Sequence, residues 1–234
     1  SLDAAGAKGL REVWFTGGEP FLHPEILELI DRALAVAPLG ILTNGMLIDD
    51  AMADALAERF HAGPYSLELR VSLDGCSREQ NDRIRGRGVF DKACDGLRRL
   101  AERGVPALVA VSLVDTETAM DREALVDILK GLGLERPRIK WIPPFRIGRE
   151  AGRGRGYDDW EMLTPEDVQH PEAYLKLQCG TSRTVTSNGV WPCPILINEP
   201  AFRLADDLDG AVGSHRVDHP ACHTCYVEGF SCST

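Results

Sequence analysis

Short apolar runs alternate with segments of helical periodicity from Val13 to Ile142. The apolar runs predict five buried strands, at Val13–Thr16, Ile41–Thr43, Leu67–Leu73, Ala107–Val114 and Arg138–Ile142. Apolar residues three or four positions apart predict helices after Pro24 and over Asp49–Phe60, Phe90–Arg103 and Arg122–Leu132. Strands that alternate with such helices form parallel sheets through right-handed crossovers, so the fold class is α/β.

Glycines and polar residues gather just after the C-terminal ends of the predicted strands. They occur at Gly17–Glu19, Thr43–Gly45, Ser72–Gly75 and Gly148. In parallel barrels and open α/β sheets this edge is where ligands bind. Five strands are too few for a closed eight-stranded barrel, so we expect a partial or truncated one.

The chain changes character after Ile142. Residues 146–159 are rich in glycine and arginine, which indicates a flexible connector or an active-site loop. Thr164 begins a short helix, and Asn188-Gly189 predicts a small hairpin. We therefore expect a core domain over residues 1–160 and a cysteine-rich domain over residues 161–234. The second domain is too small to hold a core without a metal or packing against the first.

Composition narrows the class of protein. The 234 residues are 44% apolar and 26% charged, which excludes disordered and collagen-like chains. A net charge of −10 disfavours nonspecific binding to nucleic acid, which needs a basic face. No stretch reaches the roughly 18 apolar residues of a membrane span, and Ser1–Lys8 does not resemble a signal peptide. We therefore expect a cytoplasmic protein with no nucleic-acid or membrane partner.

The seven cysteines are unevenly spread, because five of them lie in the last quarter of the chain. An odd number without a secretion signal disfavours a disulfide framework, so the cluster indicates metal binding. A hairpin at Asn188-Gly189 would bring Cys179 and Cys193 together, and Cys222-x2-Cys225 adds two thiolates. Four thiolates suit tetrahedral zinc or a four-iron cluster equally well, and both alternatives stay open.

The other cysteines and the tail histidines carry weaker signals. Cys94 falls in a predicted helix and suits a small buried residue. Cys76 lies in a loop at the strand-end rim. We interpret it as an ordinary loop cysteine in preference to a redox relay. His215 and His223 lie near the tail cysteines, and we do not expect His223 to bind metal.

Gly17-Gly18-Glu19-Pro20 is the first motif that carries chemistry. Two glycines let a ligand approach the backbone and bond its N–H and C=O groups. Glu19 adds a carboxylate suited to an ammonium group. The alternative for this tetrapeptide is a tight strand–helix turn with an exposed glutamate.

This motif and those that follow it resemble the motifs of radical SAM enzymes, in particular of the branch that carries a C-terminal twitch or SPASM domain. Ile41–Gly45 resembles the third strand of that family, and Val71–Gly75 with Asn81–Gly86 resembles its fourth strand and following loop. The resemblance covers most of the chain. It implies a partial (β/α)6 TIM-like barrel that lacks its first strand here, with a small cysteine-rich hairpin domain after it.

The resemblance also implies a site. Gly17, Gly18, Glu19 and Pro20 would hold the ammonium end of S-adenosylmethionine. The residues of the same rim that would contact this cofactor are Thr43, Asn44, Ser72, Asp74 and Arg85. Arg85 would pair with the cofactor carboxylate in a bidentate fork. One or two auxiliary iron–sulfur clusters would be bound by Cys179, Cys193, Cys222, Cys225 and Cys232, with Cys232 the start of a fuller two-cluster pattern.

The mechanism of that family is the radical cleavage of S-adenosylmethionine at a [4Fe-4S] cluster. A reductant such as flavodoxin or ferredoxin supplies the electron, and a 5′-deoxyadenosyl radical removes a substrate hydrogen. The cysteine triplet that binds this cluster, C-x3-C-x2-C, does not occur between Ser1 and Thr234, so we expect it upstream. We expect a peptide or protein side chain as substrate, as in the maturation of ribosomal peptides, with a small molecule as the next candidate. The competing hypothesis is a non-catalytic α/β binding module with a zinc-stabilised tail.

Overall fold

The computed structural model describes residues 9–113, 121–148, 150–152, 154–170, 173, 177–213 and 215–228. The chain divides into two compact units, Gly6–Ile142 and Pro143–Thr234. Each unit is described by itself.

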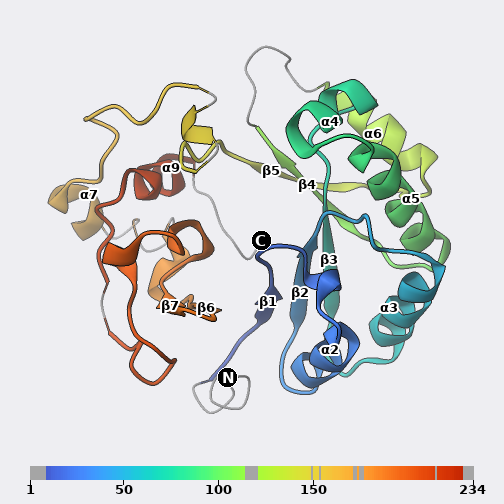
Figure 1. The fold of residues 1–234 in the computed structure, drawn as a ribbon, viewed down its shortest axis with the longest axis horizontal. Coiled ribbons are helices and arrows are strands. Elements are labelled where there is room, and N and C mark those ends of the chain that lie inside the picture. The colour runs from blue at the N-terminus through green and yellow to red at the C-terminus, as the bar shows by residue number, and fades with distance from the viewer. Residues whose placement is uncertain are drawn as a thin grey trace. The chain divides into compact units, whose positions relative to one another are not determined.

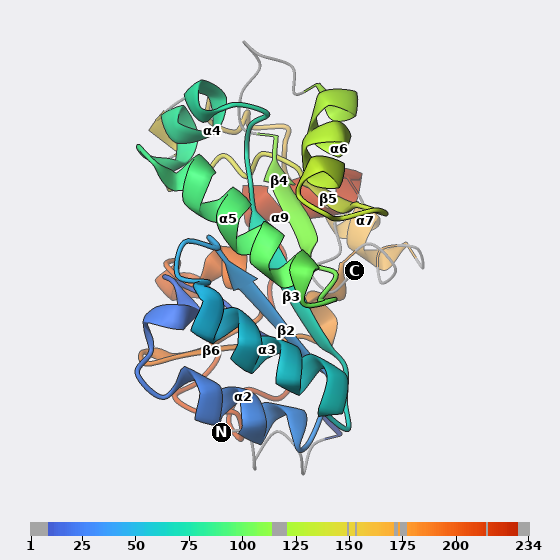
Figure 2. The ribbon, with the colours of Figure 1, turned by 90° about the vertical axis from the view of Figure 1, so that its right-hand side faces the viewer.

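The first unit is a five-stranded parallel sheet with neighbouring strands in chain order. Its strands are β1 (Val13–Phe15), β2 (Leu39–Thr43), β3 (Leu67–Ser72), β4 (Leu108–Ser112) and β5 (Arg138–Ile142). The helices are α2 (Ile26–Leu34), α3 (Asp50–Ala62), α4 (Arg78–Arg85), α5 (Val89–Glu102) and α6 (Arg122–Gly131). Figures 1 and 2 show these helices on one face of the sheet. The α/β class and the parallel strands are therefore confirmed.

The alternation of side chains along the strands builds the core. Leu67, Leu69 and Val71 of β3 are buried in a cluster that also contains the inward residues of the helices. Arg70 belongs to the opposite set of positions, yet its side chain is also buried. Its guanidinium lies 3.9 Å from the ring centroid of Trp14 and 2.7 Å from a Glu68 oxygen. Cation–π contact and ion pairing thus make the burial of this charge tolerable.

Helix α4 is an element that the apolar pattern does not predict. Its residues are nearly all polar, so the pattern carries no apolar stripe. The Ser77 side chain caps its start by accepting a hydrogen bond from the backbone N–H of Gln80. A serine followed three residues later by glutamine is a capping signal that would have marked this helix. Gly75 is required beside it, because a Cβ there would lie 2.4 Å from the backbone nitrogen of Asn81.

The second unit is small and rich in turns. It contains the antiparallel hairpin β6 (Thr184–Thr186) and β7 (Gly189–Trp191) and the helices α7 (Pro165–Gln169) and α9 (Pro220–Glu228) (Figure 1). The hairpin at Asn188-Gly189 is confirmed. The sequence pattern predicts no helix around Cys222 and Cys225, but the structure places both on α9.

The connector after Ile142 belongs to the second unit, so the structural boundary falls earlier than the expected one at residue 160. Phe145, Ile147 and Tyr157 pack against the apolar cluster of this unit. The Tyr157 hydroxyl also lies 2.9 Å from Oγ1 of Thr224 on α9. These contacts explain why residues 143–160 fold with the tail.

A buried carboxylate fixes the connector. The Glu161 side chain is 7% exposed, and its oxygens accept hydrogen bonds from the guanidinium groups of Arg146 and Arg155 at 2.5 Å. Those two arginines hold the pKa of Glu161 well below its usual range, with the backbone N–H of Asp158 adding to the effect. In the described part of the connector, arginine therefore serves as an internal ion-pair partner.

Candidate functional site

Glu19 connects two neighbouring strand ends at the C-terminal edge of the sheet. Its Oε1 accepts hydrogen bonds from the Thr43 hydroxyl at 2.7 Å and from the backbone N–H of Phe21 at 3.2 Å. Its Oε2 accepts from the backbone N–H of Asn44 at 2.8 Å. All three donors are neutral, so they fix the position of the carboxylate at this edge without pairing it with a cation.

The two glycines before Glu19 leave the backbone open. Gly17 has a φ of +91°, a conformation that favours glycine, and both residues are exposed. A Cβ built on Gly17 or Gly18 would meet no described atom within 4 Å. Pro20 then begins a 3-10 turn that leads the chain into α2. The loop therefore presents unhindered backbone groups beside a fixed carboxylate.

Asp74 forms an ion pair with Arg85 and hydrogen bonds with neighbouring parts of the chain. Asp74 Oδ2 lies 2.7 Å from Arg85 Nε, and Oδ1 accepts a hydrogen bond from the backbone N–H of Ser112 at 2.7 Å. The backbone N–H of Asp74 donates to Oδ1 of Asn81 at 2.9 Å. This arrangement fastens the end of β3 to α4 and to the end of β4. The sequence led us to expect Arg85 to pair with a cofactor carboxylate, whereas the structure supplies an internal partner.

The predicted rim residues fall into two sets on one edge, one joined by hydrogen bonds and the other by an ion pair. Glu19 joins Thr43 and Asn44, and Asp74 joins Arg85. The sets lie close, because Thr43 pairs in register with Val71, the residue before Ser72. Ser72 is partly exposed at the end of β3. The cofactor roles of all these residues stay a prediction.

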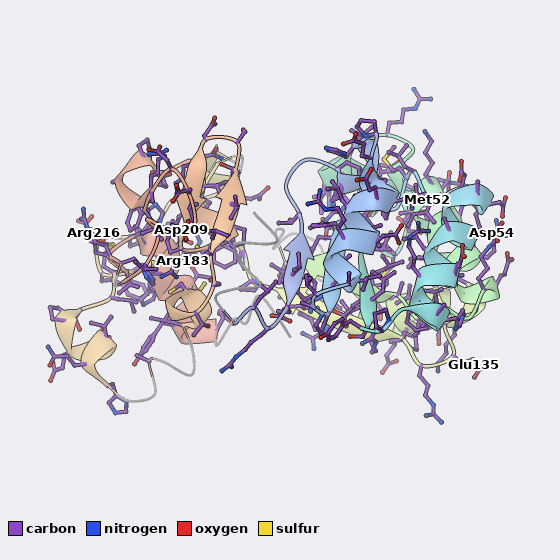
Figure 3. All side chains as sticks on the ribbon, turned by 90° about the horizontal axis from the view of Figure 1, so that it is seen from below. Met52, Asp54, Glu135, Arg183, Asp209 and Arg216 are labelled. Atoms are coloured by element: carbon purple, nitrogen blue, oxygen red, sulfur yellow. The ribbon has the colours of Figure 1, made fainter. Side chains whose placement is uncertain are left out.

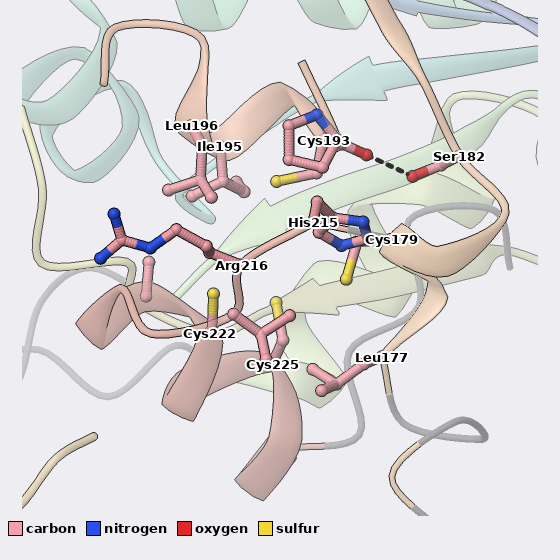
Figure 4. A pocket seen from close by; sticks show the side chains of 13 residues that line it. Leu177, Cys179, Ser182, Cys193, Ile195, Leu196, His215, Arg216, Cys222 and Cys225 are labelled. Carbon is pink, nitrogen blue, oxygen red and sulfur yellow. Dashed lines mark hydrogen bonds between the residues drawn. The ribbon is translucent and has the colours of Figure 1, made fainter. Parts of the chain in front are cut away.

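Four cysteines line one cavity of about 40 Å³ in the second unit. Cys179 lies in the turn before β6, Cys193 follows β7, and Cys222 and Cys225 are three residues apart on α9. Figure 4 shows their sulfur atoms turned toward the same space. None of the four is in a disulfide. The structure thus brings together the four described members of the predicted ligand set, and Cys232 lies outside the described residues.

The cavity is poorly suited to bare thiolates. Burial raises the pKa of Cys179 to about 11 and that of Cys222 to about 12, and it also raises the pKa of Cys193. These thiols are therefore neutral near pH 7 unless a cation stabilises the thiolate form, as a bound metal does. Among the described residues, however, no three His, Cys, Asp or Glu side chains are grouped closely enough to hold one metal ion.

Two residues beside the cavity were given no role from the sequence. His215 lines the cavity and Arg183 binds the backbone around it. His215 has a weak sequence signal, its nearness to the tail cysteines, but Arg183 has none. His223 instead packs edge-on against Trp160 at 5.8 Å between ring centroids. Cys94 lies on a helix as predicted, but it is only partly buried against the sheet core.

The family model of the radical SAM superfamily matches residues 2–129, more than half of the chain. The chain therefore belongs to the radical SAM superfamily, and the resemblance seen in its motifs is confirmed.

The chain is similar to enzymes of more than one named activity. It is 35% identical over 173 residues to the mycofactocin maturase MftC of Mycobacterium tuberculosis, covering 74% of this chain and 41% of MftC. It is 40% identical over 185 residues to the GTP 3′,8-cyclase of Chlorobaculum tepidum, and this match covers 69% of this chain and 52% of the cyclase. The chain thus spans about half or less of these curated relatives.

A solved structure supports the fold. The structure described as native anSMEcpe with bound AdoMet and Cp18Cys peptide superposes with a TM-score of 0.55 and 17% identity, covering 94% of this chain and 70% of that one. At this identity the likeness shows the fold alone. In the described residues, no helix is long and apolar enough to cross a membrane.

Proposed function

We propose that this chain forms most of the core of a radical SAM enzyme that removes a hydrogen atom from a peptide or protein side chain. The fold would be a partial (β/α)6 barrel, of which this chain supplies five parallel strands. The observation that carries the proposal is the open Gly17-Gly18 backbone beside the fixed Glu19 carboxylate, at the ligand-binding edge of a parallel sheet.

The chain's own residues would bind and orient S-adenosylmethionine. Backbone carbonyls at Gly17 and Gly18 would accept hydrogen bonds from its ammonium group, and the Glu19 charge would stabilise that cation. Ser72 would lie beside its ribose or carboxylate. Asp74 would hold Arg85 at the rim, where part of the Arg85 side chain stays exposed. When bound, the cofactor and its iron–sulfur cluster supply the radical chemistry.

The cysteine cavity fits an auxiliary iron–sulfur cluster better than zinc. A zinc ion needs four ligand atoms within about 2.3 Å of one centre. A four-iron cluster binds each thiolate to a different iron, so the sulfurs surround a wider space. The four described cysteines line one cavity, and the chain belongs to a superfamily whose cofactors include [4Fe-4S] clusters, which supports the cluster. A buried ring nitrogen of His215 without a partner also faces this cavity. The zinc-stabilised binding module is correspondingly disfavoured.

The relatives bear on the substrate. MftC is named a maturase, and the anSMEcpe structure holds a peptide, which supports a peptide substrate. The second candidate is a small molecule, supported by the 40% identity to a GTP 3′,8-cyclase.

The test uses the full protein, purified without oxygen and reconstituted with iron and sulfide. With a reductant and S-adenosylmethionine, we expect 5′-deoxyadenosine, measured by mass spectrometry. Glu19→Ala should weaken S-adenosylmethionine binding by about tenfold or more, the value of a charge-assisted hydrogen bond. Glu25→Ala is the matched control, because the Glu25 side chain makes no cap hydrogen bond. Unchanged binding in the Glu19 variant, or no cleavage by the iron-loaded protein, would contradict the proposal.

A further inference from the structure

Arg183 holds together the backbone around the cysteine cavity. Its Nε donates to the carbonyl of Ala211 at 2.7 Å, and its Nη2 donates to that of Gly213 at 3.2 Å. Its Nη1 donates to the carbonyls of Cys179 at 3.2 Å and Ser182 at 2.6 Å. Figure 3 labels Arg183 within the second unit. One side chain thus ties the segment that carries Cys179 to the segment that leads to His215.

The charge of Arg183 is not neutralised by a carboxylate among the described residues, since its acceptors are all backbone carbonyls. Burial lowers the pKa of the His215 imidazole, and the charge of Arg183 lowers it further. A fixed positive charge at this place favours an anionic group in the cavity. A cluster with four thiolate ligands is such a group.

His215 presents a buried polar atom to the same cavity. Its Nε2 is shielded from solvent and has no hydrogen-bond partner among the described residues. A buried ring nitrogen without a hydrogen-bond partner is costly, so this atom calls for a partner in the cavity. Figure 4 places the ring on the side of the cavity where Cys179 and Cys193 lie.

The other polar side chains of the cavity wall have partners. Ser182 Oγ donates to the carbonyl of Pro192 at 2.7 Å. The Arg216 guanidinium pairs with Asp218. His215 is thus the lining histidine whose ring nitrogen still lacks a hydrogen-bond partner in the described part of the chain.

We propose that His215 donates a hydrogen bond from Nε2 to a sulfur of the cluster held by the four cysteines, and that Arg183 positions it to do so. Hydrogen bonds to cluster sulfurs stabilise the more negative, reduced state and so raise the reduction potential. This inference rests on the auxiliary cluster of the proposed function. According to this inference, two residues that are not ligands of the cluster, His215 and Arg183, help to set its reduction potential.

The first measurement needs no substitution. In the reduced full protein labelled with ¹⁵N-histidine, electron–nuclear double resonance should show a weak ¹⁵N coupling and an exchangeable proton at the cluster. A strong ¹⁵N coupling would mean that a histidine binds iron, and no coupling would mean that no histidine approaches it. Either result would overturn the proposal.

The second measurement is a redox titration followed by electron paramagnetic resonance. Cys179→Ser identifies the step that belongs to this cluster. In His215→Leu that step should move to a lower potential, by about a tenfold change in the equilibrium, or about 59 mV for one electron. His215→Gln keeps an N–H donor and should move it less. His61→Leu, a histidine of the other unit, should leave it unchanged.

The outcomes separate the two proposals. Iron and sulfide retained with an unmoved potential in His215→Leu would overturn the role of His215 and leave the cluster intact. One zinc per chain without sulfide would overturn both the auxiliary cluster and the role of His215. If His215→Leu loses iron, the ¹⁵N and proton couplings of the wild-type protein decide the question.

Discussion

The two units differ in what holds their candidate site residues in place. In the first unit, Glu19 and Asp74 are fixed by hydrogen bonds between strand ends that a large apolar core already positions. In the second, the apolar cluster is small and includes Cys222 itself, a proposed ligand. The first site is therefore already fixed without its ligand, whereas in the second we expect the proposed metal group to complete the small core.

The largest effect is expected in the second unit, where it tests whether the local structure depends on a bound metal. Replacing Cys222 and Cys225 by serine should remove the cluster and the local structure of residues 177–213, because little apolar burial remains to order them. Hydrogen exchange followed by mass spectrometry should show fast exchange there and continued protection of β1–β5. Cys94→Ala, in the first unit, should leave exchange in the second unit unchanged. Protection of residues 177–213 in the iron-free double variant would refute the dependence on metal.

The next effect tests the rigidity of the first unit. Asp74→Ala removes the ion-pair partner of Arg85, which is 22% exposed, and the acceptor of the Ser112 N–H. The loss should therefore lie between about 0–1 kcal/mol, the value of an exposed pair, and about 3–5 kcal/mol, the value of a fully buried one. The Asp74 side chain is 3% exposed. The matched control is Asp91→Ala, since the Arg78–Asp91 pair is 69% and 49% exposed and such pairs contribute about 0–1 kcal/mol. Urea unfolding measures both, and equal losses would show that the Asp74 contacts do not brace the sheet edge.

These two predictions show what the sequence does and does not reveal. The parallel strands are predictable because continuous apolar runs indicate strands buried on both faces of a sheet. The shared cavity of the four tail cysteines is predictable because a cysteine cluster of this kind indicates a common metal site. The Asp74–Arg85 pair is not, because a turn aspartate and a polar-helix arginine reveal their partnership only after α4 forms. Helix α9 was missed because its cysteines and histidine give no apolar stripe. Arg183 binds carbonyls, which carry no sequence signal at all.

A smaller effect depends on pH and concerns the connector of the second unit. The pKa of Glu161 lies well below its usual value because Arg155 and Arg146 bind the carboxylate. A lowered folded-state pKa gives stability that is present above the unfolded pKa, about 4.3, and is lost as the pH falls toward the folded value. Acid unfolding of the second unit, followed by hydrogen exchange, should therefore steepen below about pH 4. Glu161→Gln should flatten that dependence, while Asp209→Asn, with an exposed side chain, should not.

The smallest change in stability gives the sharpest test of the first site. Gly18 has no positive φ, and a Cβ there meets no described atom within 4 Å, so Gly18→Ala should alter unfolding by no more than about 0.5 kcal/mol. Gly17→Ala should cost about 1–2 kcal/mol, because φ at Gly17 is +91°. If the ligand approaches this backbone as proposed, the new methyl group of Gly18→Ala stands in its path, and S-adenosylmethionine binding should weaken although the fold does not. Calorimetry of binding beside urea unfolding separates the two effects. Wild-type affinity in Gly18→Ala would show that the ligand does not contact this backbone, and the site would then have to be built from Glu19 and the strand ends alone.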